Sequence, residues 1–169
     1  MKIILASQSS SRKKALDILG LKYEIKPSHF DEKSLRFQDP KKLARLLAEA
    51  KAYSINEENN IVIAGDLFVV FRGKIIEKPK DKTEAFQMLK SFSGKELKVI
   101  ASLAVLKSRR MLSTVSECKV HFRELSDYEI KDYISRYKVV NYAGAFDGDG
   151  MLRFANHVNG SLNFITAFP

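Results

Sequence analysis

The sequence is poor in cysteine, lacks tryptophan and contains no long apolar run. One cysteine among 169 residues cannot form an internal disulfide, which fits a reducing compartment and makes the cytoplasm the expected location. The apolar stretch that begins at Ile3 is too short for a secretory leader, and no later stretch approaches the roughly 20 residues that span a bilayer, so no membrane partner is expected. Zinc-ligand spacings, phosphate-binding loop motifs and dinucleotide-binding glycine motifs are absent as well.

Acidic residues are scarce relative to basic ones. The chain has 29 Lys+Arg against 20 Asp+Glu, a net charge of +9, which indicates an anionic partner: a nucleic acid, a lipid surface or a phosphorylated small molecule. The basic residues are spread along the chain rather than gathered in one stripe, and no nucleic-acid-binding motif is visible. A nucleic-acid-binding module is therefore the less favoured alternative.

Strand and helix patterns follow one another along the chain and predict an α/β fold with a mixed sheet. Helices are expected before Gly20, from Pro40, over 85–92 and behind a capping box formed by Ser126 and Glu129. Strands and hairpins are expected at 3–6, 23–25, 61–64, 69–76, 99–106, 115–122 and 152–155. No repeat or linker is visible, so residues 1–169 are expected to form a single domain.

Polar clusters follow several of these apolar runs, where open α/β sheets bind ligands. The stretch from Ser7 to Arg12 suits a phosphate, although a serine N-cap beside a solvated arginine is the simpler interpretation of that stretch alone. The pair Asp31-Glu32 is typical of a solvated turn. Asp66 follows a buried strand and favours metal binding or water activation, with a turn-forming role as the alternative. Lys78-Pro79 holds a cation on stiff backbone, or is an ordinary charged loop.

The order and spacing of these clusters resemble those of the Maf-like nucleoside triphosphate pyrophosphatases, a family named for septum formation, over nearly the whole chain. The resemblance implies a twisted mixed sheet flanked by helices, similar to the inosine-triphosphatase-like fold, with a cleft between two lobes. It implies hydrolysis of nucleoside triphosphates to monophosphate and pyrophosphate with Mg²⁺ or Mn²⁺. The matching segments are Leu5-Ala6-Ser7-Gln8-Ser9 with Arg12, Asp31-Glu32, Ala50-Lys51-Ala52, Gly65-Asp66, Lys78-Pro79 with Ala85 and Met88-Leu89, Ser93-Gly94, Ala143-Gly144-Ala145-Phe146 and Gly160-Ser161.

The resemblance also implies roles for individual residues. It gives catalytic roles to Asp66, Glu32, Lys51 and Lys78, and it makes Glu32 and Asp66 the ligands of the divalent cation. The residue types agree with this chemistry, because a triphosphate carries about four negative charges and needs cations to absorb charge and a carboxylate to orient water. Substrate contacts are implied for Ser7, Ser9, Ser11, Arg12, Leu67 and Asp149.

Three of these positions, at which the resemblance places base selection, depart from the family's pattern. Ser11 stands where an arginine is usual, Leu67 where threonine or glutamine follows the catalytic acid, and Asp149 where glutamine precedes a glycine. An acid at position 149 favours a donor-rich base over a bare acceptor edge. We therefore hypothesise that a dTTP/UTP preference is not simply inherited, and that removal of noncanonical or modified nucleotides is the role implied.

The end of the sequence also departs from the pattern. The chain stops at Pro169, where members of the family continue into a C-terminal helix that covers the sheet or supports a dimer. We expect that helix to be absent, and a homodimer is one expected assembly. The departures leave open a family member that binds nucleotide but turns it over slowly, and the family's name leaves open a regulatory role in cell division.

Overall fold

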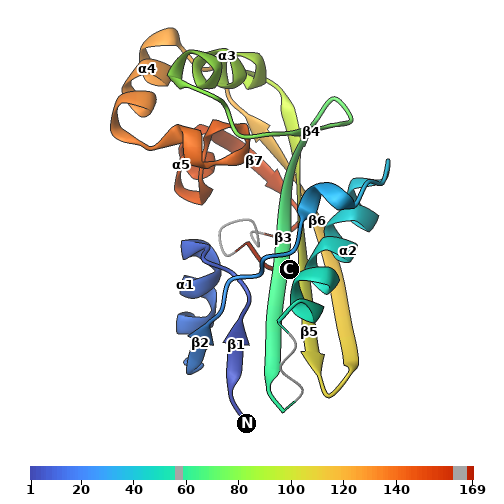
Figure 1. Cartoon of the computed structure of the whole chain (residues 1–169). Coiled ribbons are helices and arrows are strands. Elements are labelled where there is room, and N and C mark those ends of the chain that lie inside the picture. The colour runs from blue at the N-terminus through green and yellow to red at the C-terminus, as the bar shows by residue number, and fades with distance from the viewer. Residues whose placement is uncertain (56–58, 162–166) are drawn as a thin grey trace. The chain divides into compact units, whose positions relative to one another are not determined.

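A computed structural model describes residues 1–55, 59–161 and 167–169 (Figure 1). The sheet has the strand order β2-β1-β3-β5-β6-β7, and β4 pairs with β3 beside that order. The prediction of an α/β fold with a mixed sheet is confirmed. The elements in chain order are β1 Ile3–Leu5, α1 Ser10–Ile18, β2 Tyr23–Ile25, the 3-10 helix η1 Glu32–Ser34, α2 Pro40–Tyr53, β3 Ile61–Phe71, β4 Lys74–Ile76, α3 Lys82–Phe92, β5 Glu96–Lys107, β6 Arg110–Phe122, α4 Asp127–Arg136, η2 Val139–Asn141, η3 Ala143–Ala145, α5 Gly148–Phe154 and β7 Ala155–Asn159.

The chain divides into two compact units, each assembled from separate stretches of sequence. Unit 1 comprises the described residues of Met1–Leu67, Ile100–Ser116 and Thr166–Pro169, and unit 2 those of Phe68–Val99 and Glu117–Ile165. The long strands β3, β5 and β6 begin in one unit and end in the other. No described helix has the length and apolar character needed to cross a membrane.

Unit 1 is a sheet covered on both faces. Strand β1 pairs in parallel with β2 and with β3, so Ile4 lies beside Val62. Helix α2 packs on the face that carries these two side chains, and α1 packs on the opposite face through Leu16, which contacts Leu5 and Ile63. The α2 face is rich in alanine, and such small side chains let a helix lie close to a sheet. Its alanines are Ala6, Ala48, Ala52, Ala64 and Ala104.

Unit 2 is organised around aromatic side chains. Phe92 of α3 contacts Phe71, Phe122 and Phe146 through edge-to-face arrangements with ring centroids 5.0 to 6.3 Å apart. Such pairs stabilise a core beyond the area that they bury. The predicted capping box is present at the start of α4, where Ser126 and Glu129 bond each other's backbone N–H groups.

Both predicted hairpins turn through two residues. Arg72 and Gly73 separate β3 from β4 with φ of 51° and 77°, and Ser108 and Arg109 separate β5 from β6 with φ of 46° and 67°. Two consecutive positive φ values are those of a type I′ turn, whose twist matches that of the paired strands.

Several boundaries differ from the sequence prediction, three of them near the candidate site residues. Strand β3 continues through Asp66 to Phe71, because apolar residues resume directly after the Gly65-Asp66 interruption. Helix α1 begins at Ser10, inside the polar stretch from Ser7 to Arg12. The segment around Leu152 is helical, and the strand β7 starts only after it. There the carboxylate of Asp147 accepts the N–H of Gly150 at 2.7 Å and begins the short helix α5.

Candidate active site

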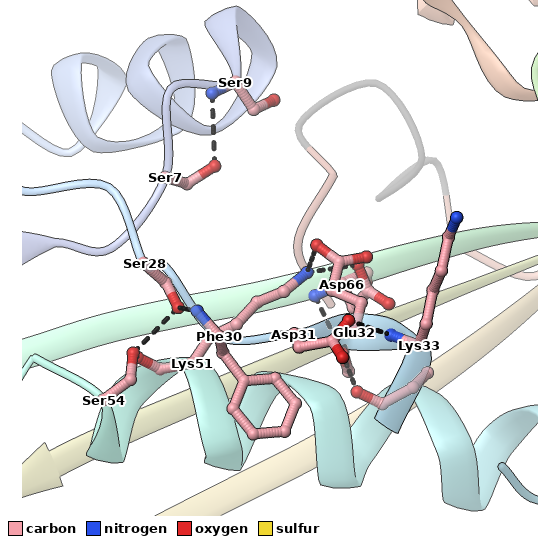
Figure 2. Close-up of polar contacts among 12 residues, drawn as sticks. Ser7, Ser9, Ser28, Phe30, Asp31, Glu32, Lys33, Lys51, Ser54 and Asp66 are labelled. Atoms are coloured by element: carbon pink, nitrogen blue, oxygen red, sulfur yellow. Dashed lines mark hydrogen bonds and ion pairs between the residues drawn. The ribbon is translucent and has the colours of Figure 1, made fainter. Parts of the chain in front are cut away.

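A lysine lies between two acids in unit 1. The Nζ atom of Lys51 is 2.9 Å from Oε1 of Glu32 and 2.9 Å from Oδ1 of Asp66. Figure 2 shows the lysine side chain rising from α2 to meet both carboxylates. The three residues come from a helix, a 3-10 turn and a strand, so tertiary packing creates the cluster.

The local sequence explains how each side chain reaches the cluster. Side chains alternate along β3, which puts Asp66 on the α2 face together with Val62 and Ala64. Lys51 faces the sheet from the last turn of α2, and the helix lies close to the sheet there because its contacts are alanines. The loop before Glu32 is tied to the end of α2 by the hydroxyls of Ser28 and Ser54, 2.8 Å apart (Figure 2).

The environment of Asp66 differs from that of Glu32. Asp66 is buried, and burial raises the pKa of its carboxyl, an effect that the ammonium of Lys51 opposes. The Glu32 side chain is 57% exposed. Oδ2 of Asp66 is buried without a hydrogen-bond partner among the described residues. A buried carboxylate oxygen without a partner is a strong acceptor for a proton or a cation.

A second cation lies on the α1 side of unit 1. The buried Arg12 guanidinium donates from Nη1 to Oγ of Ser7 at 3.0 Å and from Nε to the carbonyl oxygen of Ala167 at 3.3 Å. The Phe168 ring centroid is 5.7 Å from Cζ of Arg12. Burial lowers the pKa of Arg12, and the charges of the two cluster acids oppose that shift. An arginine stays protonated under these conditions. The guanidinium is therefore a fixed charge in a fixed orientation.

The structure brings together five of the residues singled out from the sequence. Unit 1 contains the Lys51 cluster and the Arg12–Ser7 pair, and electrostatic interaction links Arg12 to both Asp66 and Glu32. The arrangement joins two cations to two carboxylates, which is the charge pattern expected for a phosphate-transfer site.

The remaining predicted residues surround or lie apart from this cluster. Ser9 is the N-cap residue of α1, but its hydroxyl makes no capping bond, and its own N–H donates to Ser7 at 3.1 Å (Figure 2). Ser11 is half-buried in the first turn of α1, and Leu67 is half-buried next to Asp66. Lys78 is exposed in unit 2. Asp149 belongs to α5, and its side chain lies outside what the structure describes.

Sequence reasoning missed the residues that support the cluster. Ser102 is a fully buried polar residue on β5 whose hydroxyl reaches the backbone of Asp66. Ala167 and Phe168 hold Arg12 from near the other end of the chain. The one available signal was for Ser102, a lone hydroxyl within the apolar run from 99 to 106.

The acids of the cluster fit a divalent cation. Lys51 holds Oδ1 of Asp66 and Oε1 of Glu32, so Oδ2 of Asp66 has no partner among the described residues and the Glu32 carboxylate is largely exposed; both can supply oxygen ligands. Across the parts of the chain that the structure describes, no set of three or more His, Cys, Asp or Glu side chains is placed to hold a metal. Mg²⁺ is often bound by one or two carboxylates together with substrate phosphates and water. This site therefore suits a cation that arrives with a phosphorylated substrate.

Comparison with known proteins gives the family. The model of the Maf-like protein family matches residues 2–169. The chain belongs to the Maf-like protein family. The Maf-like resemblance found in the sequence is therefore confirmed.

Several curated Maf-like relatives share about a third of their residues with this chain. A dTTP/UTP pyrophosphatase of Clostridium botulinum (strain Kyoto / Type A2) is 36% identical over 99% of this chain and 91% of its own length. The dTTP/UTP pyrophosphatase of Aquifex aeolicus is 34% identical over 100% of this chain and 90% of its own length. The dTTP/UTP pyrophosphatase of Geobacillus sp. (strain WCH70) is 34% identical over 99% of this chain and 91% of its own length.

Proposed function

We propose that this Maf-like protein is a nucleoside triphosphate pyrophosphatase that hydrolyses the bond between the α- and β-phosphates. The products are a nucleoside monophosphate and pyrophosphate. The observation that carries the proposal is Lys51, whose ammonium holds the carboxylates of Glu32 and Asp66 in one cluster. Relatives that align along nearly the whole chain and bear the name dTTP/UTP pyrophosphatase support it.

The roles follow from the contacts. Oδ1 of Asp66 is held by Lys51, which leaves Oδ2 to orient water and to accept its proton. A carboxyl whose pKa is raised by burial is the better base at neutral pH, which suits Asp66 to this role. Arg12 and Lys51 stabilise the negative charge that develops on the phosphate oxygens, and the preset orientation of Arg12 avoids reorganisation during the reaction.

A divalent cation completes the charge balance. Glu32 and Asp66 are the residues that would hold Mg²⁺ or Mn²⁺, and the bound cation would supply Lewis-acid neutralisation of the triphosphate. Lys51 keeps the two carboxylates close together. Lys78 remains a proposed further cation for the phosphates, and Ser9 remains a proposed contact to the substrate.

The base specificity is proposed from two sources that differ. The names of the relatives favour dTTP and UTP as substrates. Ser11, Leu67 and Asp149 stand at the positions of base selection implied by the resemblance, and an acid at 149 favours a donor-rich or modified base. A turnover of dTTP equal to or above that of purine and modified nucleotides would overturn the interpretation of Asp149.

The deciding experiment is a panel of standard and modified nucleoside triphosphates with Mg²⁺ or Mn²⁺. Monophosphate and pyrophosphate are both quantified, because their equal release identifies cleavage between the α- and β-phosphates. Absence of turnover on the whole panel would contradict the proposal. A nucleic-acid-binding protein would instead bind oligonucleotides with an affinity that falls steeply with salt.

Variants of the cluster connect the activity to this site. We expect Asp66→Asn to lower kcat by on the order of 10²-fold or more, the usual contribution of a positioned acid or base. Glu32→Gln removes the charge of the other acid in the cluster. Its matched control is Asp31→Asn, because Asp31 is the adjacent acid and an asparagine can still accept the N–H of Lys33. Normal activity in Asp66→Asn would show that another residue activates the water.

Three further expectations remain proposals. The single cysteine supports the cytoplasm as the compartment. A homodimer and a single Maf-like domain are proposed from the resemblance. Light scattering and size-exclusion chromatography of the full chain would test the assembly.

A further inference from the structure

Ser102 is a polar residue in an otherwise apolar part of unit 1. Its side chain is fully buried on β5, the strand next to β3. Its neighbours along the same face of β5, Ile100 and Ala104, are apolar. A hydroxyl is costly to bury unless its hydrogen bonds are made. The hydrogen bonds of Ser102 therefore indicate its structural role.

The hydroxyl of Ser102 joins three elements. Its oxygen accepts the backbone N–H of Asp66 on β3 at 3.0 Å. The hydroxyl can donate to two carbonyl oxygens, that of Ala44 on α2 at 2.8 Å and that of Asp66 at 3.3 Å. The oxygen of Ala44 is the nearer acceptor. Ala44 and Lys51 lie about two turns apart on the buried side of α2. One side chain thus connects the strand of the candidate base with the helix of its lysine partner.

Gly65 makes this connection possible. A Cβ atom at position 65 would lie 2.6 Å from the backbone oxygen of Ser102 and 2.7 Å from the Phe168 ring. Both distances are far inside van der Waals contact, so any side chain here would push β3 away from β5. The glycine lets the two strands approach closely enough for the Ser102 hydroxyl to reach the next residue, Asp66.

We propose that Ser102 is a positioning residue that fixes the backbone of Asp66 and links it to α2, with Gly65 providing the close approach. The inference rests on the proposed function, in which Asp66 orients water and Lys51 holds Asp66. Ser102 itself does not touch the substrate. It sets where the Asp66 carboxylate stands relative to Lys51.

The test compares variants of β5 that differ in hydrogen bonding. Ser102→Ala removes the acceptor of the Asp66 N–H, and Ser102→Cys keeps the side-chain volume but bonds weakly. Ile100→Val is the matched control, because it removes one buried methyl group from the same face of the same strand and leaves the Asp66 contacts intact. Gly65→Ala tests the close approach.

Four quantities are measured on the full chain: thermal stability, kcat with KM for the best nucleotide, Mn²⁺ affinity by calorimetry with a non-hydrolysable nucleotide, and hydrogen exchange at the Asp66 amide. We expect Ser102→Ala to lose roughly 10- to 100-fold in kcat or Mn²⁺ affinity, the usual effect of removing a group that orients a ligand or catalytic side chain. Ser102→Cys should fall between wild type and alanine. Asp66 exchange should accelerate in Ser102→Ala more than in Ile100→Val.

The outcomes separate this inference from the proposed function. If the wild type hydrolyses nucleotide and Ser102→Ala keeps a near-normal kcat, the positioning role is overturned. It is also overturned if Ile100→Val loses as much kcat as Ser102→Ala. Unchanged exchange at Asp66 in Ser102→Ala would overturn it too. If the wild type hydrolyses no nucleotide, the proposed function fails and the exchange measurement decides on Ser102 by itself. If Ser102→Ala does not fold, Ser102→Cys is compared with Ile100→Val by the same measurements.

Discussion

Replacing Lys51 with methionine should destabilise the protein strongly. Methionine keeps most of the side-chain volume but removes the ammonium that lies 2.9 Å from Asp66. The lysine and aspartate side chains are only 10% and 11% exposed, so the variant leaves a buried carboxylate without its partner. Breaking a buried pair in this way costs about 3–5 kcal/mol. For a chain of this size, each kcal/mol lost from the free energy of unfolding lowers the midpoint of thermal unfolding by about 2–4 °C, so a fall on the order of 10 °C is expected.

The two acids should respond differently in combination with this change. Asp66→Asn removes the buried charge, so the double variant Lys51→Met/Asp66→Asn should recover most of the lost stability. The double variant Lys51→Met/Glu32→Gln should recover little stability, because Glu32 is mostly exposed and its pairing with Lys51 contributes at most about 1 kcal/mol. The assay is denaturant unfolding of all variants at neutral pH with a chelator present, so that no divalent cation binds the acids.

Two results would refute this reasoning. A cost below about 1 kcal/mol for Lys51→Met would mean that water, rather than the lysine, compensates the Asp66 charge. A double variant as unstable as Lys51→Met would mean that the loss comes from packing around the lysine stem and not from the unpaired carboxylate.

Three further predictions concern unit 2. Hydrogen bonds, first from Arg123 and second from Ser126, lower the pKa of Glu129 to about 2. The ionised Glu129 therefore stabilises the fold above pH 4.5, its ordinary pKa, and this contribution is lost as the pH falls toward 2. The melting temperatures of wild type and Glu129→Gln should converge over that interval. Burial raises the pKa of the Cys118 thiol to about 11, so iodoacetamide should modify it in denaturant but not in the folded protein at mildly alkaline pH, and rapid native modification would contradict its burial. Gly150→Ala should destabilise by about 1–3 kcal/mol, because its Cβ would lie 2.6 Å from Cζ of the buried Tyr133, whereas Gly20→Ala meets no atom within 4 Å and should lose only the strain of its positive φ; equal losses in urea unfolding would exclude the steric explanation.

Local features of the fold could be predicted from the sequence. The strand Tyr23–Ile25 and the capping box of Ser126 and Glu129 match the prediction, because each depends on residues close together in sequence. The end of β3 was predicted too early, since the Gly65-Asp66 pair interrupts its apolar pattern. The strand passes through the interruption because Ser102 accepts the N–H of Asp66 and Lys51 donates to its Oδ1, both from elsewhere in the chain.

The candidate site was predictable only in part. Asp66, Glu32 and Lys51 were named from a family resemblance, and their grouping agrees with it. The supporting contacts had no comparable signal, because they join residues far apart in sequence. Arg12 and Ala167 are separated by 155 positions, and Ser102 and Ala44 by 58. Neither periodicity nor composition reports on such pairs.

The discontinuous make-up of unit 1 has a consequence for how the protein is made. Its first stretch contains both acids and both cations of the cluster, but Ser102 belongs to the second stretch and Ala167 to the third. During synthesis, Arg12 therefore emerges long before the carbonyl group that accepts its Nε–H. The arginine can be fixed only after residue 167 has been made. For the same reason unit 1 cannot be produced as a simple fragment, and a nascent chain released early would carry the candidate site residues without the contacts that hold them.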